Sequence, residues 1–304
     1  MADKPHYYGG QAVLEGVMMR GRDQWAVAVR RPDATIHVES HDIRSNAGRA
    51  FYGWPFVRGV FALGQALSIG VKALTISANQ SQEEDNQLTT GQTVVAMTIA
   101  FVLFAAVFIV GPFLGFRLLR GDVSSGIARN LLEGLGRVAL FLCYIALIGR
   151  LKEIRRVFQY HGAEHKTIAA FEHEDRLEPE AVDRYSTLHV RCGTNFLLIV
   201  MILAIVVYAF FPAKGLLWGI VSRLVAIPLI AGLSFEMLRL GARFTGSPVM
   251  RVLMAPGLWL QKITTRPPDH GQIEVAIASF REVLRREGKL GEPGASVTRW
   301  TGSG

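Results

Sequence analysis

The chain has 304 residues, half of them are apolar, and its formal net charge is +8. This apolar content, with a positive mean hydropathy, excludes an ordinary soluble domain and favours an integral membrane protein. Only two cysteines are present, which excludes a disulfide framework. No basic motif interleaved with aromatic residues indicates nucleic acid, so no specific nucleic-acid partner is expected.

Residues 1–54 are predicted to form a small β-rich module. Apolar residues alternate on either side of a turn at 31–34, which predicts a hairpin. The alternating residues are Trp25, Val27, Val29, Ile36 and Val38. The segment 9–21 is rich in glycine, which predicts a close approach between backbones. The start of the chain lacks the apolar run of a secretory signal.

Residues 55–80 are predicted to form an amphipathic helix at the membrane interface. Polar residues recur at spacings of three, four and seven, and they form one narrow stripe on an otherwise apolar helix. These residues are Arg58, Gln65, Ser68, Lys72, Thr75 and Asn79. The segment could instead be a further membrane span, but its two cations make this the less favoured alternative.

A membrane domain is predicted over residues 93–266. The segment 94–116 holds no charge until Arg117 and is long enough to cross a hydrocarbon core of about 30 Å. The segments 195–213 and 216–238 predict two further spans, which are joined by a short turn into a helical hairpin.

A fourth span is predicted near 134–150, although its uncharged run is too short by itself. An N-terminal extension adds charges at a spacing of four, which could face protein or reach the interface. These charges are Arg129, Glu133 and Arg137.

Charge bias predicts the orientation of the four spans. The region up to Lys72, the loop 150–191 and the tail from Arg239 carry nine, eight and ten of the 33 Lys and Arg residues. All three regions fall on one side of the membrane when there are four spans. The positive-inside rule therefore predicts a multi-pass protein of the cell (inner) membrane with both termini in the cytoplasm.

The remaining segments complete the expected fold. Residues 150–194 are predicted to form a cytoplasmic loop, and 267–288 show the apolar spacing of a C-terminal amphipathic helix. Residues 289–304 predict a disordered tail. The expected class is a mainly α integral membrane protein with about four transmembrane helices, a β-rich module and interfacial helices, and its expected partner is the lipid bilayer.

The strongest candidate for chemistry is a His-x-x-Glu-His string formed by His161, Glu164 and His165. On a helix this spacing places all three on one face, where two imidazoles can hold a divalent metal such as zinc. Glu172 lies two turns beyond His165 and is a candidate third ligand, which leaves Glu164 as the general base. Alternatively, the third ligand comes from elsewhere in the chain. An ordinary polar loop can also produce such a string by chance.

A second polar group stands where the third span begins. His189, Arg191, Cys192 and Asn195 lie within seven residues, on the same predicted side as the motif. His189 is a candidate metal ligand, and Arg191 is a candidate catalytic residue that stabilises negative charge on a substrate. In a purely structural interpretation, Arg191 snorkels, Thr194 or Asn195 caps the span, and His189 is incidental.

Two carboxylates from other segments are expected on that side. Glu236, at the end of the fourth span, is a candidate metal ligand, but an ion pair with Arg191 or Arg239 is the favoured interpretation. Glu15, in the glycine-rich segment, could lie over the site as a cover.

Three strings together carry a resemblance to a known family: residues 9–21, 160–166 and 189–196. They resemble the YqhQ-like family of bacterial inner-membrane proteins, and the resemblance extends over about 8–284. It implies a domain of unknown function that has been described as a predicted metal-dependent enzyme. No established substrate comes with it.

The leading hypothesis is a metal-dependent membrane hydrolase that acts at the cytoplasmic membrane face on an unknown substrate. The alternative is a non-catalytic scaffold or biogenesis factor that binds a cytoplasmic protein or ribosomal partner, in which the polar cluster fixes the helices. A transporter is disfavoured, because few ionisable groups lie within the spans.

Overall fold

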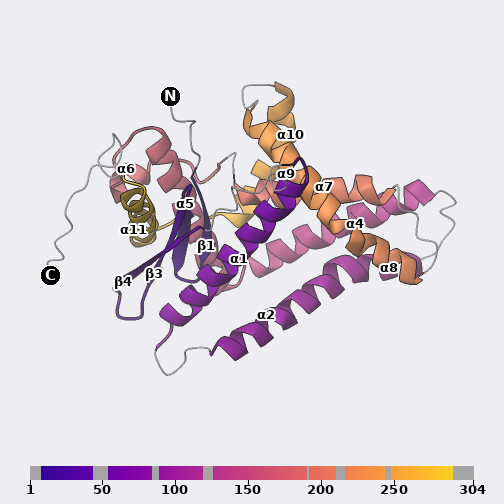
Figure 1. Ribbon diagram of the computed structural model, residues 1–304, viewed down its shortest axis with the longest axis horizontal. Helices are drawn as coiled ribbons and strands as arrows, with labels where there is room; N and C mark the ends of the chain where they lie inside the picture. The colour runs from indigo at the N-terminus through magenta and orange to yellow at the C-terminus, as the bar shows by residue number, and fades with distance from the viewer. Residues whose placement is uncertain are drawn as a thin grey trace.

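The computed structural model describes residues 8–43, 54–83, 89–118, 126–189, 192–209, 216–243 and 248–289. It has two parts, an α/β module built on a small sheet and a group of long apolar helices that extend away from it (Figure 1). The predicted class, a mainly α membrane protein with a small N-terminal β module, is confirmed.

The sheet is an antiparallel meander of four strands in the order β1-β2-β3-β4. The strands are β1 (Gly9–Val13), β2 (Gly16–Arg20), β3 (Gln24–Arg30) and β4 (Ile36–Asp42). The predicted hairpin is formed by β3 and β4. A second tight turn joins β1 to β2, and Glu15 adopts a positive φ of 49° there.

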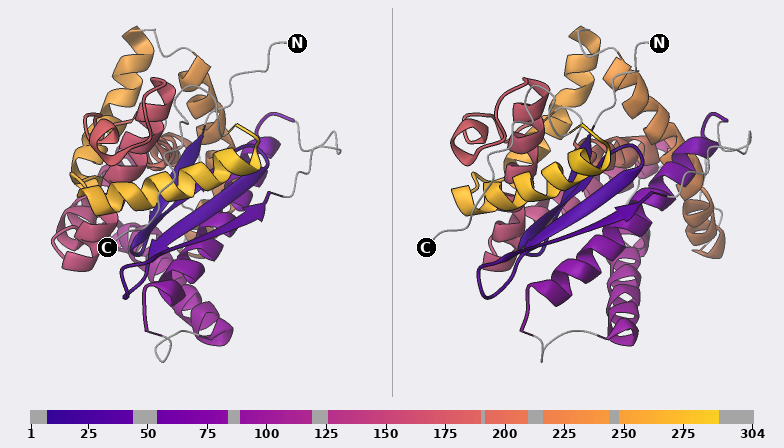
Figure 2. Two further views of the ribbon diagram at one scale, coloured as in Figure 1. Left: turned by 90° about the vertical axis from the view of Figure 1, so that its left-hand side faces the viewer. Right: turned by 60° about the vertical axis from the view of Figure 1, so that its left-hand side comes forward.

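A helix covers each face of the sheet (Figure 2). On one face lies α11 (His270–Arg286), the predicted C-terminal amphipathic helix, which Asp269 caps through a capping box. Its apolar side packs on the even-numbered residues of β3, such as Ala26 and Ala28, so this side is buried against protein.

The other face of the sheet is covered by α1 (Val57–Gln80), which also contacts the apolar helices. Ile69 and Ala73 in its C-terminal half join a core with Trp25 and other sheet residues. In its N-terminal half, Gly59 allows close contact with Phe235. The helix predicted at the interface therefore joins the module to the bundle.

Among the described residues, four helices are long and apolar enough to cross a membrane: Val57–Gln80, Gly91–Gly115, Leu131–Ile148 and Leu217–Leu240. Three of them correspond to predicted spans, and the first is the segment expected at the interface. The predicted span 195–213 corresponds to a shorter apolar helix, Gly193–Tyr208.

Helix α1 packs against a bundle of further helices. Its elements are α2 (Thr90–Ala105), the π-helical segment η3 (Ala106–Val110), α3 (Gly111–Leu118), α4 (Gly126–Ile148), α7 (Gly193–Ala209), α8 (Leu216–Val225), α9 (Ile227–Arg243) and α10 (Pro248–Thr264). Helix α7 packs against α4, α9 and α10 and is therefore central.

Charges inside the bundle pair with one another. Glu133 binds Arg223 through two hydrogen bonds of 2.9 and 2.5 Å, and it accepts a third of 2.8 Å from Arg137. Arg223 is 1% exposed. Arg137 also donates to the Phe108 carbonyl in η3, where the π-helical turn disturbs the regular hydrogen bonding. Glu133 and Arg137, from the predicted stripe, therefore face protein.

The predicted cytoplasmic loop is largely helical. It contains α5 (Lys152–Glu172) and the short α6 (Pro179–Val182). Helix α5 packs on β1 and α11 and presents the His-x-x-Glu-His string to the start of α7. Gly162 allows the backbone at Arg266 to lie close to α5, because a Cβ at position 162 would be 2.2 Å from the Arg266 carbonyl oxygen.

Candidate metal centre

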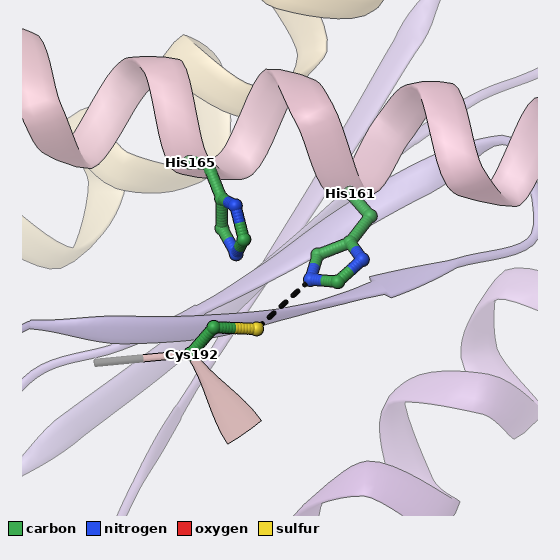
Figure 3. A group of neighbouring side chains, drawn as sticks. All are labelled: His161, His165 and Cys192. Carbon is green, nitrogen blue, oxygen red and sulfur yellow. Dashed lines mark hydrogen bonds between the residues drawn. The ribbon is translucent and has the colours of Figure 1, made fainter. Parts of the chain in front are cut away.

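The two motif histidines converge on a cysteine that is distant in sequence. One nitrogen of His161, one nitrogen of His165 and Sγ of Cys192 all lie within 4.8 Å of one another. The histidines lie one turn apart on α5, and Cys192 lies just before α7 (Figure 3). His161 Nε2 is 3.2 Å from Cys192 Sγ. The spacing of the histidines on α5 and the position of Cys192 at the start of the apolar helix α7 together create this group.

Backbone carbonyls orient both rings. Nδ1 of His161 lies 2.9 Å from the Thr264 carbonyl oxygen, and Nδ1 of His165 lies 2.5 Å from that of Thr187. Since a carbonyl only accepts, each Nδ1 carries a proton, and in a neutral ring this leaves the lone pair on Nε2. Histidines that bind metals are commonly held in this way.

His165 has the features of a metal ligand. Its Nε2 is buried and has no hydrogen-bond partner among the described residues. Burial lowers the pKa of His165 below its ordinary value, which favours the neutral ring that a metal requires. A buried nitrogen without a partner is costly, and a metal would satisfy it.

The Cys192 sulfur is held in place by the residues that begin α7. It is buried, and it accepts hydrogen bonds from the Thr194 backbone N–H at 3.4 Å and the Thr194 hydroxyl at 3.2 Å. Cys192 was expected near the site but was not among the candidate ligands.

Glu164 is buried beside the group and under the sheet. A Cβ on Gly10 of β1 would lie 2.9 Å from the Glu164 side chain, so only glycine allows this approach. Burial raises the pKa of the Glu164 carboxyl, while His161, His189 and the Gly10 N–H act in the opposite direction. A buried carboxyl with a raised pKa is suited to proton transfer.

The other predicted ligands that the structure describes bind other side chains. His189 and Glu172 pair with each other, with 3.4 Å between Nε2 and the carboxylate. The His189 ring lies next to the group, with its centroid 5.6 Å from that of His165. Glu236 accepts hydrogen bonds from both Nε and Nη2 of Arg58. Arg191 lies outside the described residues.

Helix α10 holds the segment that carries Cys192. Gln261 is fully buried. It accepts a hydrogen bond from the His189 N–H and donates to the His189 carbonyl, both at 2.8 Å, and it also donates to Asn195. Thr264, on the same helix, orients His161. Gln261 was not among the candidate residues, because a single glutamine in an apolar helix does not indicate which segment it binds.

Pockets open on two sides of the group. One, of about 230 Å³, is lined by Arg20, His189, Glu164 and Cys192 among others. The second, of about 590 Å³, shares Glu164 and Cys192 with the first and is otherwise mainly apolar. Gly10 and Gln11 of β1 line both pockets. Glu15, which was expected to cover the site, instead binds Arg156 of α5.

The comparisons with known proteins identify relatives without a known function. The profile described as "protein of unknown function (DUF1385)" matches residues 54–286. An uncharacterized protein, YqhQ of Bacillus subtilis (strain 168), is 35% identical over 301 residues, which cover 93% of this chain and 94% of that protein. No solved structure matches.

Proposed function

Because this chain belongs to the DUF1385 family of proteins of unknown function, we propose its activity from the site itself. We propose that it is a metal-dependent hydrolase that acts at the cytoplasmic face of the membrane. The observation that carries this proposal is the convergence of His161, His165 and Cys192 beside the buried carboxyl of Glu164.

The three ligand atoms suit a zinc ion. Two imidazole nitrogens and one thiolate are donors that zinc prefers, and catalytic zinc sites commonly have three protein ligands and one open position. The buried, unpartnered Nε2 of His165 supports a bound cation there. The pockets on both sides leave room for a substrate at the open position. The metal would supply a Lewis acid.

Glu164 would be the general base. Its carboxylate would accept a proton from the attacking water and pass it to the leaving group. The Gly10 N–H and the surrounding sheet hold this carboxylate in place. Arg191, four residues before Asn195, would stabilise negative charge that develops on the substrate.

A scaffold is the second candidate, and the buried network around Gln261 favours it. This network fixes the His189 segment and Asn195 to α10 without any need for a metal. Under this alternative, the chain would bind a cytoplasmic protein or ribosomal partner and would hold no stoichiometric metal.

Metal content separates the two candidates. The detergent-purified protein is analysed by inductively coupled plasma mass spectrometry, as wild type and as the double variant His161→Ala/His165→Ala. The control is His173→Ala, which removes an exposed histidine at the end of the same helix. We expect about one equivalent of metal in the wild type and the control, and less than about a tenth in the double variant. Less than a tenth in the wild type as well would favour the scaffold.

A further inference from the structure

We infer that the substrate is an anionic amphiphile from the bilayer, whose apolar chain lies between the membrane helices and whose head group reaches Arg20. This inference rests on the proposed hydrolytic function, because it names the substrate class of the same site. It is carried by two hollows that share Glu164 and Cys192, a larger one that is mainly apolar and a smaller one that contains Arg20.

The larger hollow, called here the apolar groove, is lined by helices α1, α4, α5, α7 and α10 and by strand β1. Its apolar walls include Leu67, Val71, Phe141, Ile145, Leu197 and Leu260. Leu67 and Val71 are 60% and 41% exposed on a candidate span. Exposed apolar residues on helices of this length indicate a surface that lipid covers. The groove is therefore open to chains from the bilayer.

The smaller hollow, called here the head-group pocket, is lined by basic side chains that do not line the apolar groove, Arg20 and His189. It contains Arg20 of β2, which donates a hydrogen bond to Gln65 of α1, together with Gln11 and His189. A guanidinium carries five N–H donors, so the bond to Gln65 leaves others for a phosphate or carboxylate. This end of the path therefore favours an anionic group.

The two hollows form one path past the candidate metal centre. Both are lined by Gly10, Gln11, Ala66, Glu164, Cys192 and Gly193. An amphiphile with its chain in the apolar groove and its head group at Arg20 places the bond between these parts beside Glu164. A substrate that is wholly polar would leave the groove without a ligand.

The reaction on such a substrate is an addition of water across an ester bond. The water oxygen bonds to the carbonyl carbon or phosphorus, and the bond from that atom to the ester oxygen breaks. The proton that Glu164 accepts from water goes to the ester oxygen, so the products are an acid and an alcohol. No oxidant or further reactant is required.

Photo-crosslinking tests the path without depending on catalysis. The probe is phosphatidylglycerol with a diazirine in one acyl chain, presented in mixed micelles to the full chain treated with a chelator. We expect crosslinks on α1 near Leu67 and on α4 near Ile145. Leu67→Trp fills the mouth of the groove and should reduce them about tenfold. Val60→Trp is the matched control, because Val60 is also exposed on α1 but does not line the groove.

The head-group end is tested with Arg20→Gln. In the wild type, unlabelled phosphatidylglycerol should compete with the probe more strongly than zwitterionic phosphatidylcholine does. Arg20→Gln should remove about a tenfold preference, and Arg20→Lys should retain most of it. Equal competition by both lipids in the wild type would overturn the assignment of an anionic head group.

The outcomes distinguish this inference from the proposed function. Equal crosslinking in Leu67→Trp and wild type, or crosslinks confined to α2, would overturn the groove even if the protein hydrolyses a soluble nitrophenyl ester or phosphate. Crosslinks in the groove without release of fatty acid or diacylglycerol by the zinc-loaded protein would support the lipid site and reject the hydrolase. Where lipid is hydrolysed, the released product identifies the bond that breaks.

Discussion

At the scale of single residues, close packing between β1 and α5 positions the candidate base. A Cβ on Gly10 would lie 2.6 Å from the Met18 carbonyl oxygen and 2.9 Å from the Glu164 side chain. Neither neighbour has room to move, because Met18 is paired within the sheet and Glu164 is buried. Glycine at this position therefore determines where the carboxylate lies.

We predict that Gly10→Ala abolishes most activity and lowers stability by about 1 to 3 kcal/mol, the usual cost of overpacking. The measurements are thermal unfolding in detergent and the hydrolysis assay. Gly9→Ala is the control, because a Cβ at Gly9 meets nothing within 4 Å. Equal effects of the two variants would show that the contact with Glu164 does not matter.

The histidines of the site could be predicted from sequence, but the complete ligand group could not. Helical spacing alone places His161 and His165 on one face. Cys192 belongs to a different helix, so its contact with them depends on how α5 and α7 pack. Glu236 was ambiguous for the same reason, because its partner Arg58 lies 178 positions away. Local patterns identify residues that share a helix, whereas packing decides which helices meet.

At the scale of elements, the buried charges of the bundle hold three helices together. Glu133 of α4 binds Arg223 of α8, and Arg137 joins α4 to η3. The side chains of Glu133 and Arg223 are 5% and 2% exposed. Removal of one partner from such a group leaves an uncompensated charge in a medium of low dielectric constant.

We predict that Glu133→Gln destabilises the protein by about 3 kcal/mol or more, because two guanidinium groups lose their counter-charge. Unfolding in detergent, followed by circular dichroism, measures this effect. Glu153→Gln is the control, because Glu153 is exposed at the start of α5. A change below about 1 kcal/mol would indicate that water or lipid compensates the two arginines.

The attachment of α11 to the sheet is expected to depend on pH. The Glu282 carboxylate accepts hydrogen bonds from Arg285 and from the Ser40 hydroxyl of β4. The bond from Arg285 is the main cause that holds the pKa of Glu282 below its ordinary value of 4.5. A lowered folded-state pKa means that this stabilisation is complete above 4.5 and is lost as pH falls through the lower value.

We predict that Glu282→Gln lowers the melting temperature at pH 7 by an amount that corresponds to about 1 kcal/mol, and that the difference between the two proteins is smaller at pH 3. Thermal unfolding at both pH values measures the difference. An equal decrease at both pH values would mean that side-chain shape, and not the carboxylate charge, stabilises this contact.

The elements themselves were largely predictable, and their surroundings were not. Hydropathy predicted the helices at 94–116, 134–150 and 216–238, because lipid-facing helices carry apolar residues on most sides. The same property made α1 ambiguous. Its polar stripe indicated an interface with water, yet one side of the helix packs against the sheet and α9. A polar stripe shows which side of a helix is polar. It does not show what covers the other sides of the helix.

At the scale of the whole molecule, the two ends of the described chain are held together. Strand β1 and helix α11 belong to one module, which also contains α5 and its histidines. The module must lie on one side of any membrane that the apolar helices cross. The distribution of Lys and Arg predicts that this side is the cytoplasm.

We predict that single cysteines introduced into a Cys143→Ser background will confirm this orientation in intact cells. Arg176→Cys, at an exposed turn of the module, should react with a membrane-impermeant maleimide only after permeabilisation. Lys214→Cys, in the loop outside the described residues that is expected on the opposite side, should react without it. The remaining Cys192 is buried and provides the background signal. Reaction of Arg176→Cys in intact cells would place the candidate metal centre outside the cytoplasm, because α5 and the turn that follows it belong to the same module.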